Sequence, residues 1–200
     1  ASHEKVAANM EAKYGNTATL NLATLNLPAG CSFGKISTTD ADSIFDGTPS
    51  IANSTLSAKL ANGAAKAGKK ATITIPVSST NYADYTIEVT VTVLAKTAQT
   101  LSAAPIAMTY GDAAKKIEVS GAVGSLSYEV TDGMDIVSVD TNGNVTAIKS
   151  GTATITITAA ETSTHASGST TVTVTIAKRA LTVKADDKTA YIGDKQPELT

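Results

Sequence analysis

The chain has 200 residues and a formal net charge of −2 at pH 7, and 42% of its residues are hydrophobic. This apolar fraction is enough to form real cores, which argues against a disordered chain. Acidic and basic residues are scattered along the sequence, so no basic stripe is available for the phosphates of a nucleic acid. No apolar stretch approaches the roughly 20 residues needed to cross a bilayer, so we expect no membrane span in this sequence.

A single cysteine, Cys31, limits the redox and metal chemistry of the chain. One cysteine forms no intramolecular disulfide and cannot build a metal site from several thiolates. We interpret Cys31 as a small core residue. The sequence opens on Ala1 without the basic and apolar regions of a signal peptide and stops at Thr200 within a pattern. We therefore expect a fragment whose targeting signals lie outside it.

Alternating apolar and polar residues predict strands in the N-terminal half. Ile or Val alternates with Thr most strictly within residues 72–75 and 86–93, which is the period of a strand with one buried face. An alternative is open at residues 58–70, where Ala and Lys favour a short helix, but Gly63 and Gly68 each cost such a helix about 1 kcal/mol relative to Ala. We favour strands, and place them at residues 17–22, 31–38, 55–60, 70–77 and 85–94.

The C-terminal half shows the same alternation between turns rich in glycine. Asn142-Gly143, which follows Asp140, is the clearest hairpin turn because both residues tolerate positive φ. The pattern predicts about seven strands at the spacing of an immunoglobulin-like sandwich. The strands that we can place lie at residues 116–119, 125–130, 136–139, 144–148, 152–158 and 171–176.

An internal repeat indicates the architecture. Residues 71–93 resemble residues 153–176, so that Tyr82 corresponds to His165, at an offset of about 82 residues. A second marker recurs near the start of each unit, as Tyr14-Gly15-Asn16, Tyr110-Gly111-Asp112 and the looser Tyr191-Ile192-Gly193-Asp194.

These markers predict an all-β chain of tandem immunoglobulin-like β-sandwiches. We assign residues 1–96 and 97–177 to two sandwiches, and residues 178–200 to the truncated first strands of a third module. The linkers around residues 96 and 179 contain neither Gly/Ser runs nor Pro-rich spacing, so we expect limited freedom between neighbours. The opening strands of a module cannot bury a core alone, so we expect residues 178–200 to be disordered or paired with a sheet edge.

The run MDIVSVDTNGNVTAIKSGTATITIT, residues 134–158, resembles the bacterial immunoglobulin-like group 2 family. That family shares a Val-x-Asp-x-x-Gly-x-Val-Thr-x-x-x-x-Gly-Thr-Ala-Thr-Ile pattern, which marks turns and core strands and is not a catalytic signature. Residues 1–96 share the closing strand pair but lack the hairpin, so we interpret them as a divergent relative. The residues that match the pattern are Val139, Asp140, Gly143, Val145, Thr146, Gly151, Thr152, Ala153, Thr154 and Ile155.

A second resemblance lies at the C-terminal end. Residues 178–200, KRALTVKADDKTAYIGDKQPELT, resemble the opening of the MBG or YDG repeat of bacterial surface proteins, although Ile192 interrupts the Tyr-Gly-Asp triplet. The two resemblances imply a rod of β-modules on a large secreted or wall-attached bacterial protein, often joined to adhesive, leucine-rich-repeat or carbohydrate-active regions. A shared fold does not fix a function.

The sequence offers no catalytic constellation. Histidine is the usual base near neutral pH, and the chain has two. His3 lies in a terminal segment, and we interpret His165 as a surface residue of a loop. A nucleophile elbow, a phosphate-binding glycine loop and a His-Glu-x-x-His helix are all absent from the sequence. We therefore predict no enzyme, no catalytic residue and no cofactor.

Two acidic groups raise the question of calcium, which binds several oxygen ligands on a bent loop. Asp40, Asp42 and Asp46 lie close together, but their spacing lacks the fifth-position ligand and the distal Glu of an EF-hand. We favour a turn that carries solvated acids and assign no metal site. Asp186-Asp187 and Asp194 form a second group, which we interpret as a solvated loop.

Sugar binding and a covalent crosslink are further alternatives. Aromatic rings stack on sugar faces, and Tyr82 and Tyr85 lie three residues apart, but Tyr85 fits better as a cap on the core at a strand start. Some related surface modules carry a Lys-to-Asn isopeptide bond beside a buried acid. No motif identifies such a trio here.

We expect a non-catalytic structural spacer of a secreted or surface-attached bacterial protein, acting as a monomer outside the cell. The first alternative is recognition of a host protein or glycan, through an inter-module groove or an apical loop such as residues 40–49. The second is an ancillary module of a secreted carbohydrate-active enzyme. A contiguous apolar or aromatic surface patch would favour recognition.

Overall fold

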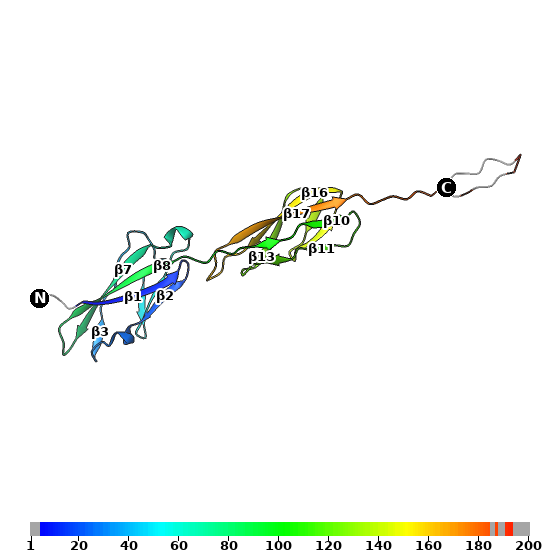
Figure 1. Ribbon diagram of the computed structural model, residues 1–200. Coiled ribbons are helices and arrows are strands. Elements are labelled where there is room, and N and C mark those ends of the chain that lie inside the picture. The colour runs from blue at the N-terminus through cyan, green and yellow to red at the C-terminus, as the bar shows by residue number, and fades with distance from the viewer. Residues whose placement is uncertain (1–4, 185–186, 188–190, 194–200) are drawn as a thin grey trace. The chain divides into compact units, whose positions relative to one another are not determined.

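The computed structural model describes residues 5–184, 187 and 191–193 (Figure 1). Within these ranges the chain is all-β, with seventeen strands and two short 3-10 turns, so the predicted fold class is confirmed. The chain divides into two compact units. The first comprises Ala1–Leu101, Gly121–Leu126 and Thr158–Ser169, and the second comprises Ser102–Ser120, Ser127–Ile157 and Thr170–Thr200. The module boundaries near residues 96 and 177 remain predictions.

The strands before residue 95 form two sheets. One sheet has the order β1-β8-β7-β3, with β4 also paired to β7, and the other has the order β2-β6-β5. Figure 1 shows β1, β8 and β7 side by side. The strands are β1 (Lys5–Lys13), β2 (Thr17–Asn21), β3 (Cys31–Phe33), β4 (Ser37–Thr39), β5 (Ser50–Ala52), β6 (Thr55–Lys59), β7 (Lys70–Ser79) and β8 (Tyr85–Leu94).

The predicted alternation creates the core of this N-terminal sandwich. Along β7 and β8 every second side chain is buried, and the register places Ile73 opposite Val89. Burying one such side chain is worth about 1.5–3 kcal/mol, so the facing rows dominate the stability of the sandwich. The side chains with 0% exposure on these two strands are Ile73, Ile75, Ile87, Val89, Val91 and Val93.

The strands after residue 101 form three sheets. Their orders are β10-β17-β16-β13, β11-β15-β14 and β12-β9. Val145 on β15, Ile155 on β16 and Val174 on β17 are each 0% exposed, so both of the larger sheets bury apolar side chains. The strands are β9 (Ser102–Ala103), β10 (Ile106–Thr109), β11 (Lys115–Lys116), β12 (Val119–Ser120), β13 (Leu126–Asp132), β14 (Val137–Val139), β15 (Asn144–Ala147), β16 (Gly151–Ala159) and β17 (Gly168–Ala177).

The first and last long strands of each half pair in parallel. β1 runs parallel to β8 over nine residue pairs, from Lys5 opposite Thr86 to Lys13 opposite Leu94. β10 runs parallel to β17 over four pairs, which end at Thr109 opposite Ala177. In a parallel pair the start of one strand lies beside the start of the other. The chain therefore enters at one end of the paired strands and leaves at the opposite end.

Four strands were not predicted from the sequence, namely β1, β5, β9 and β10. β1 reads KVAANMEAK, and its buried positions Ala8 and Met10 are not β-branched, so the usual strand composition is missing. Its partner β8 is more than seventy residues away in sequence, and that pairing supplies the hydrogen bonds that define the strand.

Two predicted strands in the N-terminal half were too long. The strand at residues 17–22 ends at Asn21, whose side chain accepts a hydrogen bond from the Ala23 amide (3.0 Å) and begins a 3-10 turn at Leu22–Leu25. The strand at residues 31–38 is divided into β3 and β4, which both pair with β7, and between them the Gly34 amide donates to the Pro76 carbonyl (2.7 Å). The helical alternative at residues 58–70 is wrong apart from one 3-10 turn at Ala64–Lys66.

The predicted hairpin at residues 140–144 is confirmed, with a different turn. β14 and β15 pair antiparallel with Val139 opposite Val145. Only Gly143 of the Asn-Gly pair has a positive φ (80°), and its amide donates to the Asp140 carbonyl (3.0 Å). The turn therefore requires glycine at one position, and the Asp140 side chain organises the rest.

Beyond β17 the described residues 178–184, 187 and 191–193 contain no strand. Leu181 and Val183 alternate with polar residues, as in a strand with one apolar face, yet they are 87% and 83% exposed. The structure thus shows no core contact for these two apolar side chains.

Candidate functional site

The Tyr-Gly turn that marks each of the first two repeats lies at the end of the parallel strand pair and is hydrogen-bonded to the last residue of the partner strand. After β1, the Tyr14 amide donates to the carbonyl of Leu94, the last residue of β8 (3.1 Å), and Gly15 follows with a φ of 75°. After β10, the Tyr110 amide donates to the carbonyl of Ala177, the last residue of β17 (2.9 Å), and Gly111 has a φ of 86°. The two tyrosines therefore occupy equivalent positions.

The first of these tyrosines, Tyr14, is buried and lies beside the ion pair of a buried lysine. Tyr14 is 3% exposed and belongs to the core of the N-terminal sandwich. The Lys96 ammonium group lies 4.8 Å from the centroid of the Tyr14 ring and 2.6 Å from a Glu161 carboxylate oxygen. The Lys96 side chain is only 4% exposed. A buried lysine needs such partners, because its charge has lost most of its hydration.

The surroundings of the second tyrosine are open. Tyr110 is 50% exposed. Arg179 follows the last residue of β17 by two positions, as Lys96 follows the last residue of β8, and its guanidinium donates to the Gly111 carbonyl (3.4 Å). A tyrosine and a cation are thus brought together at both turns, but no residue in the position of Glu161 meets the second cation in the described part of the chain.

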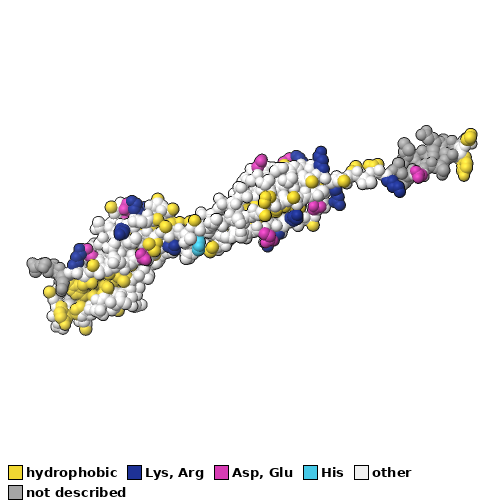
Figure 2. Space-filling view, viewed as in Figure 1, with side chains coloured by type: hydrophobic (Ala, Val, Ile, Leu, Met, Phe, Trp, Pro, Cys, Tyr) yellow, Lys and Arg dark blue, Asp and Glu magenta, His cyan; other side chains and the backbone are white. Residues whose placement is uncertain are grey.

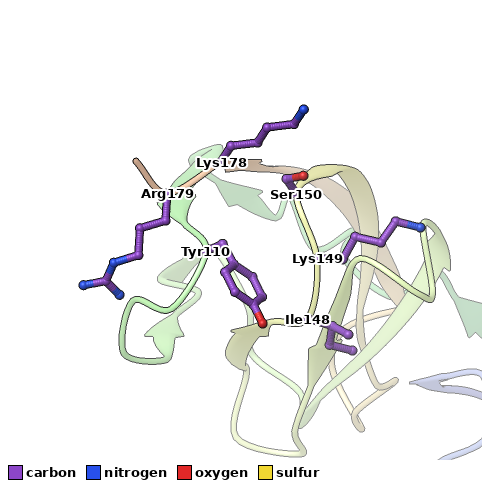
Figure 3. Close-up of a pocket in the computed structure, with 6 residues that line it drawn as sticks. All are labelled: Tyr110, Ile148, Lys149, Ser150, Lys178 and Arg179. Carbon is purple, nitrogen blue, oxygen red and sulfur yellow. The ribbon is translucent and has the colours of Figure 1, made fainter. Parts of the chain in front are cut away.

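Tyr110 forms one wall of a surface hollow of about 450 Å³. Figure 3 shows the Tyr110 ring directed toward Ile148, while the Lys178 and Arg179 side chains extend outward. Ile148 is 49% exposed, so the hollow has an apolar floor beside cationic edges. We call this surface the Tyr110 hollow, and its lining residues are Tyr110, Ile148, Lys149, Ser150, Lys178 and Arg179.

The charge of the Tyr110 hollow is positive. Lys149 forms an ion pair with Asp135, and the hydrogen bond and charge of Lys149 hold the pKa of that carboxyl below its ordinary value. Lys178 and Arg179 are both exposed. On the face shown in Figure 2, cationic and anionic side chains are otherwise dispersed. A carboxylate is the simplest group that would complement the hollow.

The acidic loop at Asp40, Asp42 and Asp46 is a structured turn. The two carboxylate oxygens of Asp40 accept from the Ile44 and Phe45 amides (2.8 and 3.1 Å). Asp42 forms an ion pair with Lys69 (3.2 Å). No cluster of three or more His, Cys, Asp or Glu side chains suited to a metal occurs among the described residues. Of the second acidic group, Asp186 and Asp194 lie outside those residues, and Asp187 is exposed.

The structure separates the two tyrosines of the predicted aromatic platform. Tyr82 is 61% exposed, whereas Tyr85 is half-buried at the first residue of β8, as predicted. The Tyr85 hydroxyl lies 3.6 Å from the Cys31 sulfur, and burial together with Cys31 raises the pKa of Tyr85 to about 12. Cys31 packs partly buried against the core, which agrees with its interpretation as a core residue.

His165 takes part in the fold of its loop. Its amide donates to the Thr162 hydroxyl (3.0 Å), its Nδ1 lies 2.9 Å from the Thr164 hydroxyl, and it forms a bridge with Thr97. His165 is half-buried rather than an open surface residue. His3 lies outside the described residues.

Gln99 is a structural residue that the sequence interpretation missed. It is 8% exposed and forms four hydrogen bonds through its side-chain amide. Its nitrogen donates to the Ala160 and Ala166 carbonyls (2.9 and 2.7 Å). Its oxygen accepts from the Val123 and Gly124 amides (2.8 and 3.0 Å). Gln99 therefore connects two loops that are far apart in sequence.

Comparisons with solved structures return extracellular adhesion and surface proteins. The cadherin domains 1–4 of protocadherin gamma B7 match with 10% identity and a TM-score of 0.30, over 89% of this chain and 50% of that one. A SusE-like surface polysaccharide-binding protein of Bacteroides thetaiotaomicron matches with 13% identity and a TM-score of 0.32, over 86% and 33%. Surface layer protein SbsC matches with 16% identity and a TM-score of 0.37, over 78% and 21%.

The chain thus spans half or less of the length of these three structures. No family model matches the chain, and no curated protein matches it. Among the described residues, no helix is long and apolar enough to cross a membrane.

Proposed function

We propose that this chain is a non-catalytic structural spacer of a secreted or surface-attached bacterial protein, where it acts outside the cell as a monomer. The observation that carries the proposal is the parallel pairing of β1 with β8 over nine residue pairs. At about 3.3 Å per residue, that pairing separates the entry and exit of the chain by about 30 Å. A domain with this topology lengthens the chain that contains it.

The second half also pairs an early strand in parallel with its last strand. β10 runs parallel to the end of β17, and β17 is ten residues long. This pairing covers four residue pairs, about 13 Å at about 3.3 Å per residue, and ends with Thr109 opposite Ala177. Our division into modules 1–96, 97–177 and 178–200, and the assignment to the bacterial immunoglobulin-like group 2 and MBG or YDG families, belong to the same proposal.

Recognition is the second candidate function. The Tyr110 hollow favours it, because its two exposed cations are suited to bind an anionic group while the half-exposed Tyr110 ring offers an apolar contact beside them. The ligand would be a host protein or a glycan, or a substrate held for the catalytic domain of a secreted carbohydrate-active enzyme. We rank the spacer first because the parallel terminal strands recur in both halves.

Mechanical unfolding tests the spacer proposal. Pulling on the two ends of the chain loads the parallel strands along their length, so all nine pairs between β1 and β8 resist together. We expect a discrete unfolding event for the N-terminal sandwich, with an extension of roughly 300 Å at about 3.5 Å per residue.

The control is a disulfide between Lys5→Cys and Thr86→Cys in a Cys31→Ser background. Lys5 and Thr86 are register partners, so the bond is geometrically feasible, and it should abolish most of that extension. A chain that extends without any such event, with or without the disulfide, would show that the module does not bear load.

A further inference from the structure

We propose that Asn62 is a site of self-modification: the Gly63 amide nitrogen attacks the Asn62 side chain, which becomes aspartate or isoaspartate. The chain has two Asn-Gly pairs, Asn62-Gly63 and Asn142-Gly143. Such pairs are prone to this reaction because glycine has no side chain to hinder the attack. The structure favours the reaction at the first pair and opposes it at the second. The inference goes beyond the spacer proposal and does not depend on it.

The reaction needs only water. The Gly63 nitrogen loses its proton to hydroxide and bonds to Asn62 Cγ. The bond from Cγ to Nδ2 breaks, and the leaving nitrogen takes a proton from water to become ammonia. Water then opens the succinimide ring at either of its two carbonyl carbons, giving aspartate or isoaspartate. Each product carries a carboxylate in place of the neutral amide, and no oxidant or reductant is involved.

The Asn62 side chain lies where the attack begins. The Gly63 amide donates a hydrogen bond to Asn62 Oδ1 (3.0 Å). A carbonyl bond is about 1.2 Å long, so Cγ lies at most about 4.2 Å from the attacking nitrogen. Reacting atoms in productive geometries are about 3–3.5 Å apart, so a small rotation completes the approach.

The space around the two glycines differs. A β-carbon at Gly63 would have no described atom within 4 Å, so the backbone has room to rotate into the ring. Gly143 is buried, and a β-carbon there would lie 2.7 Å from Cζ of Tyr128. Both asparagines are exposed, so access of water does not distinguish them. Ring closure at Asn142 has to move backbone that is packed against a tyrosine.

The Gly143 amide is also held by another partner. It donates to the Asp140 carbonyl (3.0 Å). The amides on either side, of Asn142 and Asn144, donate to Asp140 Oδ1 (2.8 and 2.9 Å). These bonds fix the backbone around the nitrogen, and the negative charge of Asp140 opposes loss of its proton. Gly63, in contrast, donates to the very group that it attacks.

The modification changes the turn that follows β1. A β-carbon at Gly15 would lie 2.9 Å from Asn62 Oδ1, so the Asn62 side chain packs directly on this turn. The Gly15 amide donates to the Ala61 carbonyl (3.1 Å). Isoaspartate adds one carbon to the main chain between residues 62 and 63, directly after that contact. We expect this lengthening to strain the contact and to lower the free energy of unfolding of the N-terminal sandwich.

The test is to incubate the folded full chain in mildly alkaline buffer and to follow both asparagines by peptide mass spectrometry. Labelling by an isoaspartyl methyltransferase identifies isoaspartate. We expect Asn62 to deamidate at least about tenfold faster than Asn142, since one hydrogen bond that must break before the reaction slows it by about that factor. In urea both pairs lose their surroundings and should react at similar rates, which provides the internal control.

Asn62→Gln is the matched variant, because it keeps the amide but closes a ring far more slowly. After the same incubation the wild-type N-terminal sandwich should unfold at lower urea than before, whereas the variant should not change. Equal rates at Asn62 and Asn142 in the folded chain, or a faster reaction at Asn142, would overturn the proposal. An equal loss of stability in Asn62→Gln would overturn the effect on the Gly15 turn.

Discussion

Replacing Gln99 should destabilise β13 and β16, which adjoin the two loops that Gln99 connects, more than any surface substitution does. Gln99→Met keeps the length of the side chain and removes its amide. The variant loses hydrogen bonds to four backbone groups, on Val123, Gly124, Ala160 and Ala166. No described buried side-chain polar atom lacks a partner in the native structure, so the wild-type site is fully satisfied.

The expected cost follows from those four bonds. Each net hydrogen bond contributes about 0.5–1.5 kcal/mol, so losing four costs about 2–6 kcal/mol. We expect the lower half of that range, about 2–4 kcal/mol, because water can replace part of the bonding at the exposed Val123.

Urea unfolding followed by hydrogen exchange and mass spectrometry measures this effect for each half separately, which avoids treating a two-unit chain as one transition. Peptides from β13 and β16 should lose protection at lower urea, while peptides from β7 and β8 should not change. Thr100→Val, at an exposed neighbouring position, is the matched control. A loss below about 0.5 kcal/mol, the range of ordinary surface substitutions, would refute the argument from Gln99.

Three further predictions concern the core, the hairpin and the Cys31–Tyr85 pair. Ile155→Ala, at a side chain with 0% exposure, should cost about 2–5 kcal/mol in urea unfolding, and a smaller loss would mean that the site collapses around the cavity. Hydrogen bonds from Asn144 lower the pKa of Asp140 in the folded chain. The Asp140 carboxylate therefore stabilises the folded chain at pH values above its unfolded pKa, and this stabilisation is lost as pH falls through its folded pKa. Asp140→Asn should therefore flatten the acid limb of the thermal stability curve, and an unchanged limb would contradict that assignment. Because the pKa of Tyr85 is raised to about 12, its contribution to stability should be lost as pH rises from about 10, and Cys31→Ala should move its ultraviolet titration toward the ordinary value.

The strands with strict alternation were predictable because the alternation of apolar and polar residues itself indicates which face of the strand is buried. Residues 85–94 were predicted with the observed bounds of β8, since Ile87 and Val89 alternate with polar residues. β1 escaped prediction because its buried residues, Ala8 and Met10, are not β-branched and its strand is defined by pairing with β8. The residues near β1 in the sequence do not indicate that β8 is its partner.

The candidate site was predictable only in part. The repeated Tyr-Gly marker was visible in the sequence, but nothing local distinguishes Tyr14, which is 3% exposed, from Tyr110, which is 50% exposed. Tyr14 is buried by core residues that are distant from it in sequence, whereas Tyr110 lines an open hollow. Gln99 was missed for the same reason, because its partners lie 24 to 67 residues away.

The spacer function depends most directly on the distance between the entry and the exit of one sandwich. Spin labels at Lys5→Cys and Ala95→Cys in a Cys31→Ser background report that distance by pulsed electron paramagnetic resonance. The parallel register of β1 and β8 predicts about 30 Å, at about 3.3 Å per residue. A distance near 5 Å, roughly the spacing of neighbouring strands, would place entry and exit at the same end and contradict the spacer proposal.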